Sequence, residues 1–370
     1  MPPRVIIPIL LIAGGAAPLA AQESSPKPEV IEGWVRDLGA ERYSKRDAAT
    51  KSLIETGAAA IKPVNEGIAQ HGLEVTTRGI YVLQQLAVAG DEATEASART
   101  SLERIAAARV TAAARHARDA LSKLDALRQQ RALDELERLG ALVDRSYQET
   151  SSWLGPLFMI EINSNWRGGP DDLRWLEYLH DLQQISFVGP QVEDTWLARI
   201  AGMPNVKLVK IKRANITDAG LAPLKTLEQL EFVRLLYMDI GDDAVVHLAP
   251  CQRATKIDLF GTKVTGKGED ELRKAVAARI DRRRGAFLGI SPNDPDNAAW
   301  EIRTVTPGTA ADQAGLRPGD VFVTYDTKKV GDFHSLTAMI AEHDVGHVVD
   351  VTLRRDGEII ERRIQLGEWD

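Results

Sequence analysis

A 24-residue pattern of apolar positions recurs through the middle of the chain. Four aliphatic residues, each 24 positions after the last, mark its most regular position: Val192, Ile216, Ile240 and Val264. Ahead of each of them the chain carries apolar residues with the spacing L-x-x-L-x-L. The end of that spacing alternates apolar and polar positions, which predicts one short strand in each repeat. One unit of this length cannot bury its own apolar face, but stacked units bury a continuous core, so the pattern predicts a solenoid.

Residues 28–140 follow a helical pattern instead. Apolar residues recur there with spacings of three and four, beginning with Ile31, Trp34, Val35 and Leu38, and this predicts amphipathic helices. Residues 46–86 resemble HEAT-type helical repeats, because two short helices lead into a third that carries an arginine. The alternative is a plain helical bundle. A run of leucines over residues 124–139 predicts a long helix that leads to the solenoid.

The strand motif of the solenoid resembles that of leucine-rich repeats, and its sequence ITDAGL at Ile216–Leu221 is typical of bacterial members of that family. The resemblance implies an α/β solenoid over residues 157–281, preceded by a linker over residues 141–156. One ladder position departs from the family, which usually has Asn or Thr where this chain has Pro190, Ala214, Met238 and Thr262. Three of these side chains cannot hydrogen-bond to a turn, so we expect irregular turns.

A third pattern begins after the basic residues 282–285, which we interpret as a solvated hinge. The segment Phe287-Leu288-Gly289-Ile290 is followed by a Pro-Gly turn at residues 307–308 and by a helical stretch over residues 333–343. Asp356-Gly357 then separates two alternating runs, which is a hairpin signal. Residues 286–368 thus resemble a PDZ domain of the kind found in bacterial HtrA-type and carboxy-terminal-processing proteases.

That resemblance implies a peptide-binding site, in which an extended peptide adds as a strand along a sheet edge. The amides of the loop would receive a terminal carboxylate, and Gly289 would let the backbone approach it closely. Phe333, Thr337 and Ile340 share one helical face across the groove. If His334 rather than Phe333 opens the helix, it could contact a Ser or Thr hydroxyl of the peptide. The predicted peptide-binding set is Phe287, Leu288, Gly289, Ile290, Phe333, Thr337 and Ile340.

The concave face of the solenoid is a second candidate binding surface. Alternation along the strands points a mixed set outward: Leu208, Lys210, Phe232, Arg234, Leu236 and Phe260. Contiguous exposed apolar side chains usually mark a contact with a partner or with another domain. The alternative is that another part of the same chain covers this face.

Composition and motifs exclude several classes of function. The 370 residues carry a net charge of -7, which argues against a nucleic-acid role, and the lone Cys251 excludes an internal disulfide. The sequence has no G-x-S-x-G, H-E-x-x-H or Walker-type motif. Only His343 and His347 of the seven histidines have a metal-ligand spacing, and Asp344 with Gly346 makes them part of a loop. We therefore expect no enzyme, no metal and no cofactor.

The N-terminus has the order of a secretory signal. An arginine at position 4 is followed by an apolar run over residues 5–12 and by small residues through Ala21. We expect a signal peptide over residues 1–21, a polar linker over residues 22–27 and a mature chain without a transmembrane helix, either periplasmic or extracellular. The alternative is an uncleaved segment that anchors the chain at the membrane.

Together these patterns predict a multidomain protein of α plus α/β class. It has a HEAT-like helical array, a leucine-rich solenoid and a small β-rich PDZ domain. The expected function is that of a non-catalytic extracytoplasmic scaffold that binds peptide segments or protein C-termini. The alternatives are a regulatory or adaptor subunit of a separate extracytoplasmic protease, and a structural scaffold that binds through the concave face of the solenoid.

Overall fold

The protein is described by a computed structural model that covers residues 26–108, 111–145, 158–297 and 300–369. The predicted signal peptide, residues 1–21, and most of the predicted linker 141–156 lie outside the described residues. The chain divides into two compact units, residues 1–127 and 128–370. No helix among the described residues has both the length and the apolar character needed to cross a membrane.

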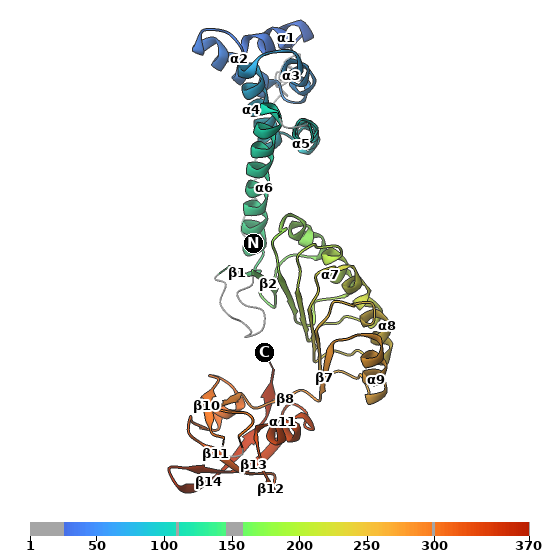
Figure 1. The fold of residues 1–370 in the computed structure, drawn as a ribbon, viewed down its shortest axis with the longest axis vertical. Helices are drawn as coiled ribbons and strands as arrows, with labels where there is room; N and C mark the ends of the chain where they lie inside the picture. The colour runs from blue at the N-terminus through green and yellow to red at the C-terminus, as the bar shows by residue number, and fades with distance from the viewer. Residues whose placement is uncertain (1–25, 109–110, 146–157, 298–299, 370) are drawn as a thin grey trace, which may run out of the picture. The chain divides into compact units, whose positions relative to one another are not determined.

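The first unit is helical, as the spacing of apolar residues predicts. Its core consists of the apolar faces of the helices, where Val35, Leu38, Leu53 and Leu83 are buried. Gly79 lets two helices approach closely, because a Cβ there would lie 2.8 Å from the Ile68 side chain. The helices are α1 (Pro28–Asp37), α2 (Tyr43–Thr56), α3 (Ala58–Gln70), α4 (Leu73–Ala89), α5 (Glu92–Ala106) and the first half of α6 (Ala112–Arg138) (Figure 1).

The second half of α6 belongs to the second unit. Ala132, Leu133 and Leu136 are buried in the hydrophobic core of this unit, which also contains the inward side chains of its seven-stranded sheet. The predicted helical segment 28–140 is therefore divided within its last helix, because this end of α6 has an apolar face of its own. The next residues form a strand, β1 (Leu142–Asp144), where the sequence predicts a linker. This prediction was wrong because β1 pairs with the first strand of the sheet and Val143 packs against its core.

The sheet of the second unit has the strand order β1 to β7. β1 is antiparallel to β2, and β2 to β7 are all parallel, with the short helices α7 (Asp194–Leu197), α8 (Val245–Leu248) and α9 (Gly266–Ala275) along one side (Figure 1). From β3 to β6 each residue pairs with the residue 24 positions later, as Ile185 does with Val209. The parallel strands are β2 (Met159–Ile162), β3 (Gln184–Val188), β4 (Leu208–Lys212), β5 (Phe232–Leu236), β6 (Lys256–Phe260) and β7 (Arg279–Arg283).

The turns after the strands are regular, and the expectation of irregular turns was wrong. One residue at each turn has a positive φ, at positions 24 apart: Gly189, Arg213, Tyr237 and Gly261. The backbone N–H of each of these donates to the last carbonyl of the next strand, over 2.7–2.9 Å. Backbone groups thus satisfy one another, and no side-chain amide is required. Ala214 and Met238, which replace the usual polar residue, are buried in the core instead.

A second ladder uses aspartates. The carboxylates of Asp194, Asp218 and Asp242 lie 24 residues apart, and each accepts a backbone N–H of the following repeat over 2.8 Å. Asp242 accepts from both the N–H and the hydroxyl of Thr265, which begins α9. These hydrogen bonds favour the charged form and hold the pKa of the Asp242 carboxyl below its usual value.

This lowered pKa gives a pH-dependent prediction. We expect Asp242→Ala to lower the free energy of unfolding more than Asp243→Ala does, since the neighbouring Asp243 is exposed. Because the pKa of the Asp242 carboxyl is lower in the folded state than the unfolded value of 3.8, its ionisation stabilises the fold above that pH. This stabilisation is lost as the pH falls through the folded pKa. Denaturant titrations at pH 7 and at about pH 3 will check this. The difference in free energy of unfolding between the two variants should shrink at low pH. A difference that widens there would contradict the assignment.

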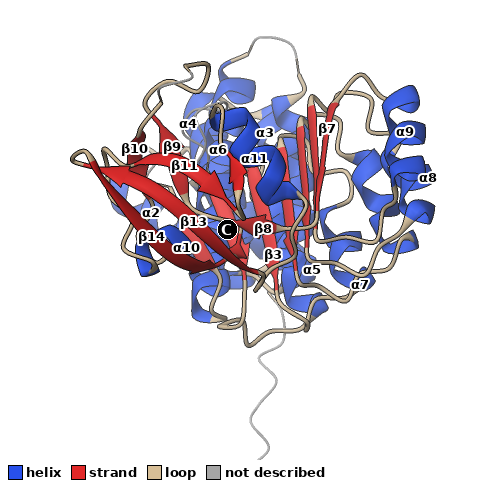
Figure 2. Ribbon diagram, turned by 90° about the horizontal axis from the view of Figure 1, so that it is seen from below, coloured by secondary structure: helices blue, strands red, loops and turns tan. Residues whose placement is uncertain are grey.

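The C-terminal part of the second unit is a small β-rich domain. A four-stranded sheet has the order β12-β11-β13-β14, and two further pairs join β9 to β10 and β8 to β15 (Figure 2). Asp356 and Gly357 both have positive φ and close the β13–β14 hairpin, which confirms the hairpin signal. The elements are β8 (Ala286–Phe287), β9 (Ile290–Pro292), β10 (Ile302–Val305), α10 (Ala310–Gln313), β11 (Val321–Tyr325), β12 (Lys328–Lys329), α11 (Phe333–Ala341), β13 (Val348–Arg355), β14 (Glu358–Gln365) and β15 (Gly367–Glu368).

An ion pair fixes the start of β11 against the end of β13. The Asp320 carboxylate is fully buried and receives Nε and a terminal nitrogen of Arg355 over 2.7 and 2.8 Å. It also accepts the Arg317 N–H over 2.8 Å. The hydrogen bonds that the guanidinium donates to this carboxylate raise the pKa of Arg355. The Arg-Pro-Gly-Asp sequence therefore makes a turn whose last side chain holds two strands together.

Removing Asp320 would leave the half-buried Arg355 guanidinium and the Arg317 N–H without their buried acceptor. We expect Asp320→Ala to lower the free energy of unfolding by about 3 kcal/mol in denaturant titrations at pH 7. The control is Asp350→Ala, which removes an ion pair to Arg363 whose two side chains are both largely exposed. Exposed pairs contribute little, so this variant should remain close to the parent protein. Equal losses for the two variants would contradict the prediction.

Candidate functional site

A groove runs between β9 and α11, and its cavity has a volume of about 360 Å³. Loop residues line one end, β9 forms one side and α11 forms the other. The structure brings all the predicted peptide-binding residues to its walls: Phe287, Leu288, Gly289, Ile290, Phe333, Thr337 and Ile340. Leu288 and Ile340 are also buried in the domain core, so they connect the groove floor to the packing beneath it.

The loop before β9 is held in one conformation by its neighbours. Gly289 has a φ of 89°, and a Cβ at this position would lie 2.1 Å from the Thr309 hydroxyl oxygen. Only glycine fits here without strain, because residues with a side chain rarely adopt this φ and because no space exists for a Cβ atom. The carbonyls of Leu288 and Gly289 accept the N–H groups of Ala311 and Thr306 over 2.8 and 2.9 Å.

The orientation of these carbonyls determines which way β9 points. The Gly289 carbonyl faces β10, the partner strand of β9. Because successive peptide groups of a strand point to opposite edges, those of Ile290 face away from β10 and toward the groove. β9 therefore offers a strand edge on the side where α11 lies. An extended chain could pair with this edge by main-chain hydrogen bonds.

The facing wall is the helix α11. Asp332 caps it by accepting the Ser335 N–H, and this bond lowers the pKa of the Asp332 carboxyl. Phe333 is the first helical residue, and its ring meets the buried Trp300 edge to face at 5.2 Å. His334 is exposed, with its ring nitrogen 3.1 Å from the Asp296 carboxylate. The alternative in which His334 opens the helix was therefore wrong.

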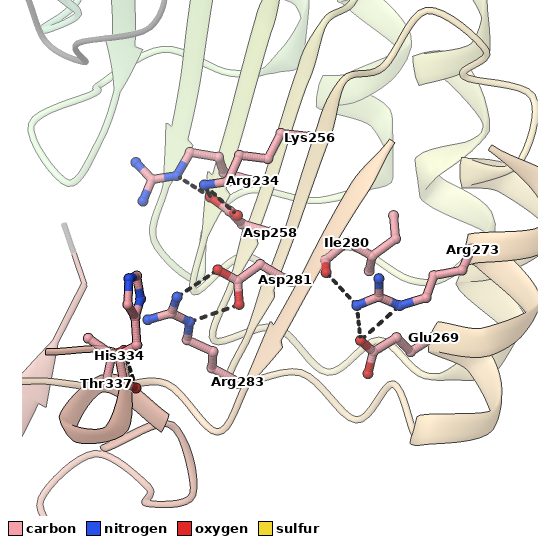
Figure 3. A network of polar contacts seen from close by, with 10 residues as sticks. All are labelled: Arg234, Lys256, Asp258, Glu269, Arg273, Ile280, Asp281, Arg283, His334 and Thr337. Atoms are coloured by element: carbon pink, nitrogen blue, oxygen red, sulfur yellow. Dashed lines mark hydrogen bonds and ion pairs between the residues drawn. The ribbon is translucent and has the colours of Figure 1, made fainter. Parts of the chain in front are cut away.

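Four residues of the groove were not predicted, and two of them, Ser291 and Pro292, continue β9. The other two, Arg283 and Trp369, line the cavity from outside the loop and helix. The Arg283 guanidinium pairs with Asp281 over 2.7 and 2.8 Å (Figure 3) and lies 5.1 Å from the Phe260 ring and 5.2 Å from the Trp369 ring. Trp369 in turn lies 4.1 Å from the Phe287 ring. The predicted basic hinge 282–285 is wrong for its first half, because Arg282 and Arg283 belong to β7 and pair with residues of β6.

The concave face differs from its prediction. A cavity of about 270 Å³ lies there, lined by Leu208, Lys210, Phe232, Arg234 and Phe260 of the predicted set. Leu208, Leu236 and Phe260 are buried, however, so a contiguous exposed apolar surface was the wrong expectation. Phe260 is covered by Trp369, whose ring lies 5.3 Å away. This agrees with the alternative that the chain itself covers part of the face.

The rest of the concave cavity is strongly charged. Asp258 is buried and lies 3.2 Å from Arg234 and 2.9 Å from Lys256 (Figure 3). Asp281 follows on the next strand, paired with Arg283. Lys210, Arg234 and Lys256 are half-buried, so their charged ends reach the cavity while their stems pack on the sheet.

The fold and the groove together define a PDZ domain, and residues 286–366 match the PDZ domain family. The PDZ region is similar to that of HtrA-type proteases. A stretch of 65 residues is 37% identical to the serine protease Do-like HtrA of Lactobacillus helveticus, covering 18% of this chain and 16% of that protein. Another of 113 residues is 27% identical to the periplasmic serine endoprotease DegP of Escherichia coli K12, covering 30% and 20%.

Further relatives follow the same pattern. A stretch of 102 residues is 34% identical to the magnetosome formation protease MamE of Paramagnetospirillum magneticum, covering 28% of this chain and 14% of that protein. A serine endoprotease structure from Yersinia pestis is similar with a TM-score of 0.22 and 24% identity, over 28% of this chain and 34% of that one. The chain thus spans a fifth or less of the length of these curated relatives.

Proposed function

We propose that this protein is a non-catalytic extracytoplasmic scaffold whose PDZ domain binds peptide segments or protein C-termini by strand addition. The observation that carries the proposal is the groove itself. It combines a strand edge at Ile290, a glycine loop fixed at Gly289 and an apolar helix wall at Phe333. Such sites give affinities of about micromolar, which suits a transient contact.

Under this proposal, the other segments present the groove and add surfaces of their own. Residues 157–281 would be a leucine-rich repeat solenoid, and residues 28–140 a HEAT-like array. The 24-residue register of the parallel strands supports the first assignment, and the succession of short packed helices supports the second. The order of basic, apolar and small residues over 1–21 supports export, with cleavage or with retention at the membrane.

The absence of catalysis is part of the proposal. The names of the relatives are those of proteases, but the similarity lies in their PDZ region. The sequence lacks the motifs expected of a serine or metal protease, as described above. A role as a regulatory or adaptor subunit of a separate extracytoplasmic protease fits the same groove. Copurification of such a protease, lost when residues after 285 are deleted, would favour that role.

We expect Gly289→Glu to lower the affinity of the PDZ groove for peptides by at least about tenfold. The peptides tested are those that the parent chain selects from a peptide array. The added side chain would strain the loop and meet Thr309. Gly357→Glu is a matched control, because Gly357 also has a φ of 89° but has no atom within 4 Å of its Cβ position.

A second pair of variants separates groove binding from damage to the loop. Thr337→Trp would fill the groove from the helix wall, whereas Ala338→Trp places the same side chain at the next, exposed position. We expect loss of binding for the first variant and retention for the second. Equal or absent binding for the parent chain, Gly289→Glu and Thr337→Trp would reject the proposed function.

The concave face supports a second candidate function, in which the solenoid itself captures a partner. The specific observation is the charged cavity that Lys210, Arg234 and Lys256 line. We expect the double variant Lys210→Glu with Arg234→Glu to abolish capture of an acidic partner while leaving peptide binding in the PDZ groove within about twofold. Surface plasmon resonance with both ligands measures this. A partner that is lost with the groove variants instead would reject the concave-face function.

A further inference from the structure

Three side chains that could ligate a metal ion meet at the end of the PDZ domain where α11 finishes. They are Asp326, His343 and His347, and one ligand atom of each lies within 4.8 Å of the others. We propose that they bind a divalent first-row transition ion, with Zn²⁺ as the ion that fits best. None of the three lines the peptide groove, so this site is separate from the proposed peptide-binding function.

The carboxylate of Asp326 is oriented by its own turn. Asp326 and Thr327 have φ values of 46° and 66° in the tight turn between β11 and β12. One carboxylate oxygen, Oδ1, accepts the Asp350 N–H over 3.0 Å, and the Asp326 N–H donates to the Asp350 carbonyl over 2.9 Å. These bonds leave Oδ2 directed at the two imidazoles.

The two histidines are held by the backbone around them. The His343 carbonyl accepts the Ala286 N–H over 3.2 Å, and the His347 carbonyl accepts the Leu366 N–H over 2.8 Å. The turn between them brings the rings together, with their centroids 4.0 Å apart and their planes 10° apart. The His343 ring also rests beside the buried Tyr325 ring at 5.8 Å. The pairing of the histidines is thus a feature of the folded loop.

The distances leave room for an ion between these groups. Asp326 Oδ2 is 3.9 Å from Nε2 of His343 and 4.0 Å from Nε2 of His347, too far for direct hydrogen bonds. A tetrahedral ion with ligand bonds of about 2.0–2.2 Å would separate its ligands by about 3.4 Å. Small side-chain rotations would close the remaining gap, since His347 is exposed and Asp326 and His343 are half-buried.

The donor set favours a borderline metal. Two imidazole nitrogens and one carboxylate oxygen suit zinc and its first-row neighbours, whereas calcium and magnesium prefer oxygen ligands alone. Three protein ligands would leave at least one position for water or for an outside donor. An ion here would join the β11–β12 turn to the loop after α11, next to the strand β8 that leads into the groove loop.

The test uses the full mature chain without a polyhistidine tag, titrated with ZnCl₂ at pH 7.5 against a competing zinc indicator. Co²⁺ serves as a second probe, because its visible absorption strengthens when the ion passes from water into a four- or five-coordinate site. The variants are His343→Ala, His347→Ala and Asp326→Asn, the last because asparagine tolerates a positive φ. His334→Ala is the matched control, since it removes an exposed histidine that faces a single aspartate, Asp296.

We expect each cluster variant to weaken Zn²⁺ binding by at least about tenfold and to lose the Co²⁺ absorption, while His334→Ala stays within about twofold. Circular dichroism of each variant verifies that it is folded. The site is overturned if the parent chain gives no Co²⁺ absorption, or if the cluster variants bind Zn²⁺ as the parent does. It is also overturned if His334→Ala loses as much affinity as they do. Peptide binding is independent of all these outcomes.

Discussion

The second unit depends on a backbone constraint that recurs once in each repeat. A residue of positive φ ends the strand, and its N–H bonds to the last carbonyl of the next strand. The last of these bonds runs from Gly261 to the carbonyl of Arg283 over 2.9 Å. Because β7 is thereby held in the sheet up to its final residue, the direction in which the chain enters the PDZ domain at Gly285 is set by the same ladder that joins the parallel strands β3 to β7.

Contacts near the entry point extend this constraint. The Tyr237 hydroxyl donates to the Gly285 carbonyl over 2.6 Å and accepts a hydrogen bond from the backbone N–H of Trp369 over 2.8 Å. Glu368 pairs with Lys212 at 3.7 Å and also with Arg213. Side chains at the ends of β4 and β5 therefore contact β15 and the residue that follows it. Trp369, held there by Tyr237, covers Phe260, which is buried although the strand pattern alone would expose it.

The sequence could predict what local periodicity encodes. The strand positions of the repeats, the hairpin at Asp356-Gly357 and the PDZ loop all follow from residue types at fixed spacing. In these elements a residue contacts neighbours at a fixed sequence spacing, which the pattern itself specifies. The peptide-groove residues Phe333 and Thr337 were predictable for the same reason, since a short helix can place both on one wall.

What could not be predicted depends on contacts between distant segments or between backbone groups. The turn ladder has no side-chain signal, because Arg213 and Tyr237 are unusual residues for a positive φ. Trp369 reaches Phe260 and Phe287 from a position more than 80 residues later than either of them. The sequence predicts a linker where β1 lies, because three residues are too short for a periodic signal.

The shared position of Arg283 has a consequence for how the PDZ domain is studied. Arg283 and Trp369 line both the peptide groove and the concave cavity, yet both lie outside the matched range 286–366. A fragment trimmed to that range would retain the loop and the helix but lose a cation and an indole from the mouth of its groove. Its peptide preferences would then be those of a more open cleft, without the indole and guanidinium that line the groove of the intact chain.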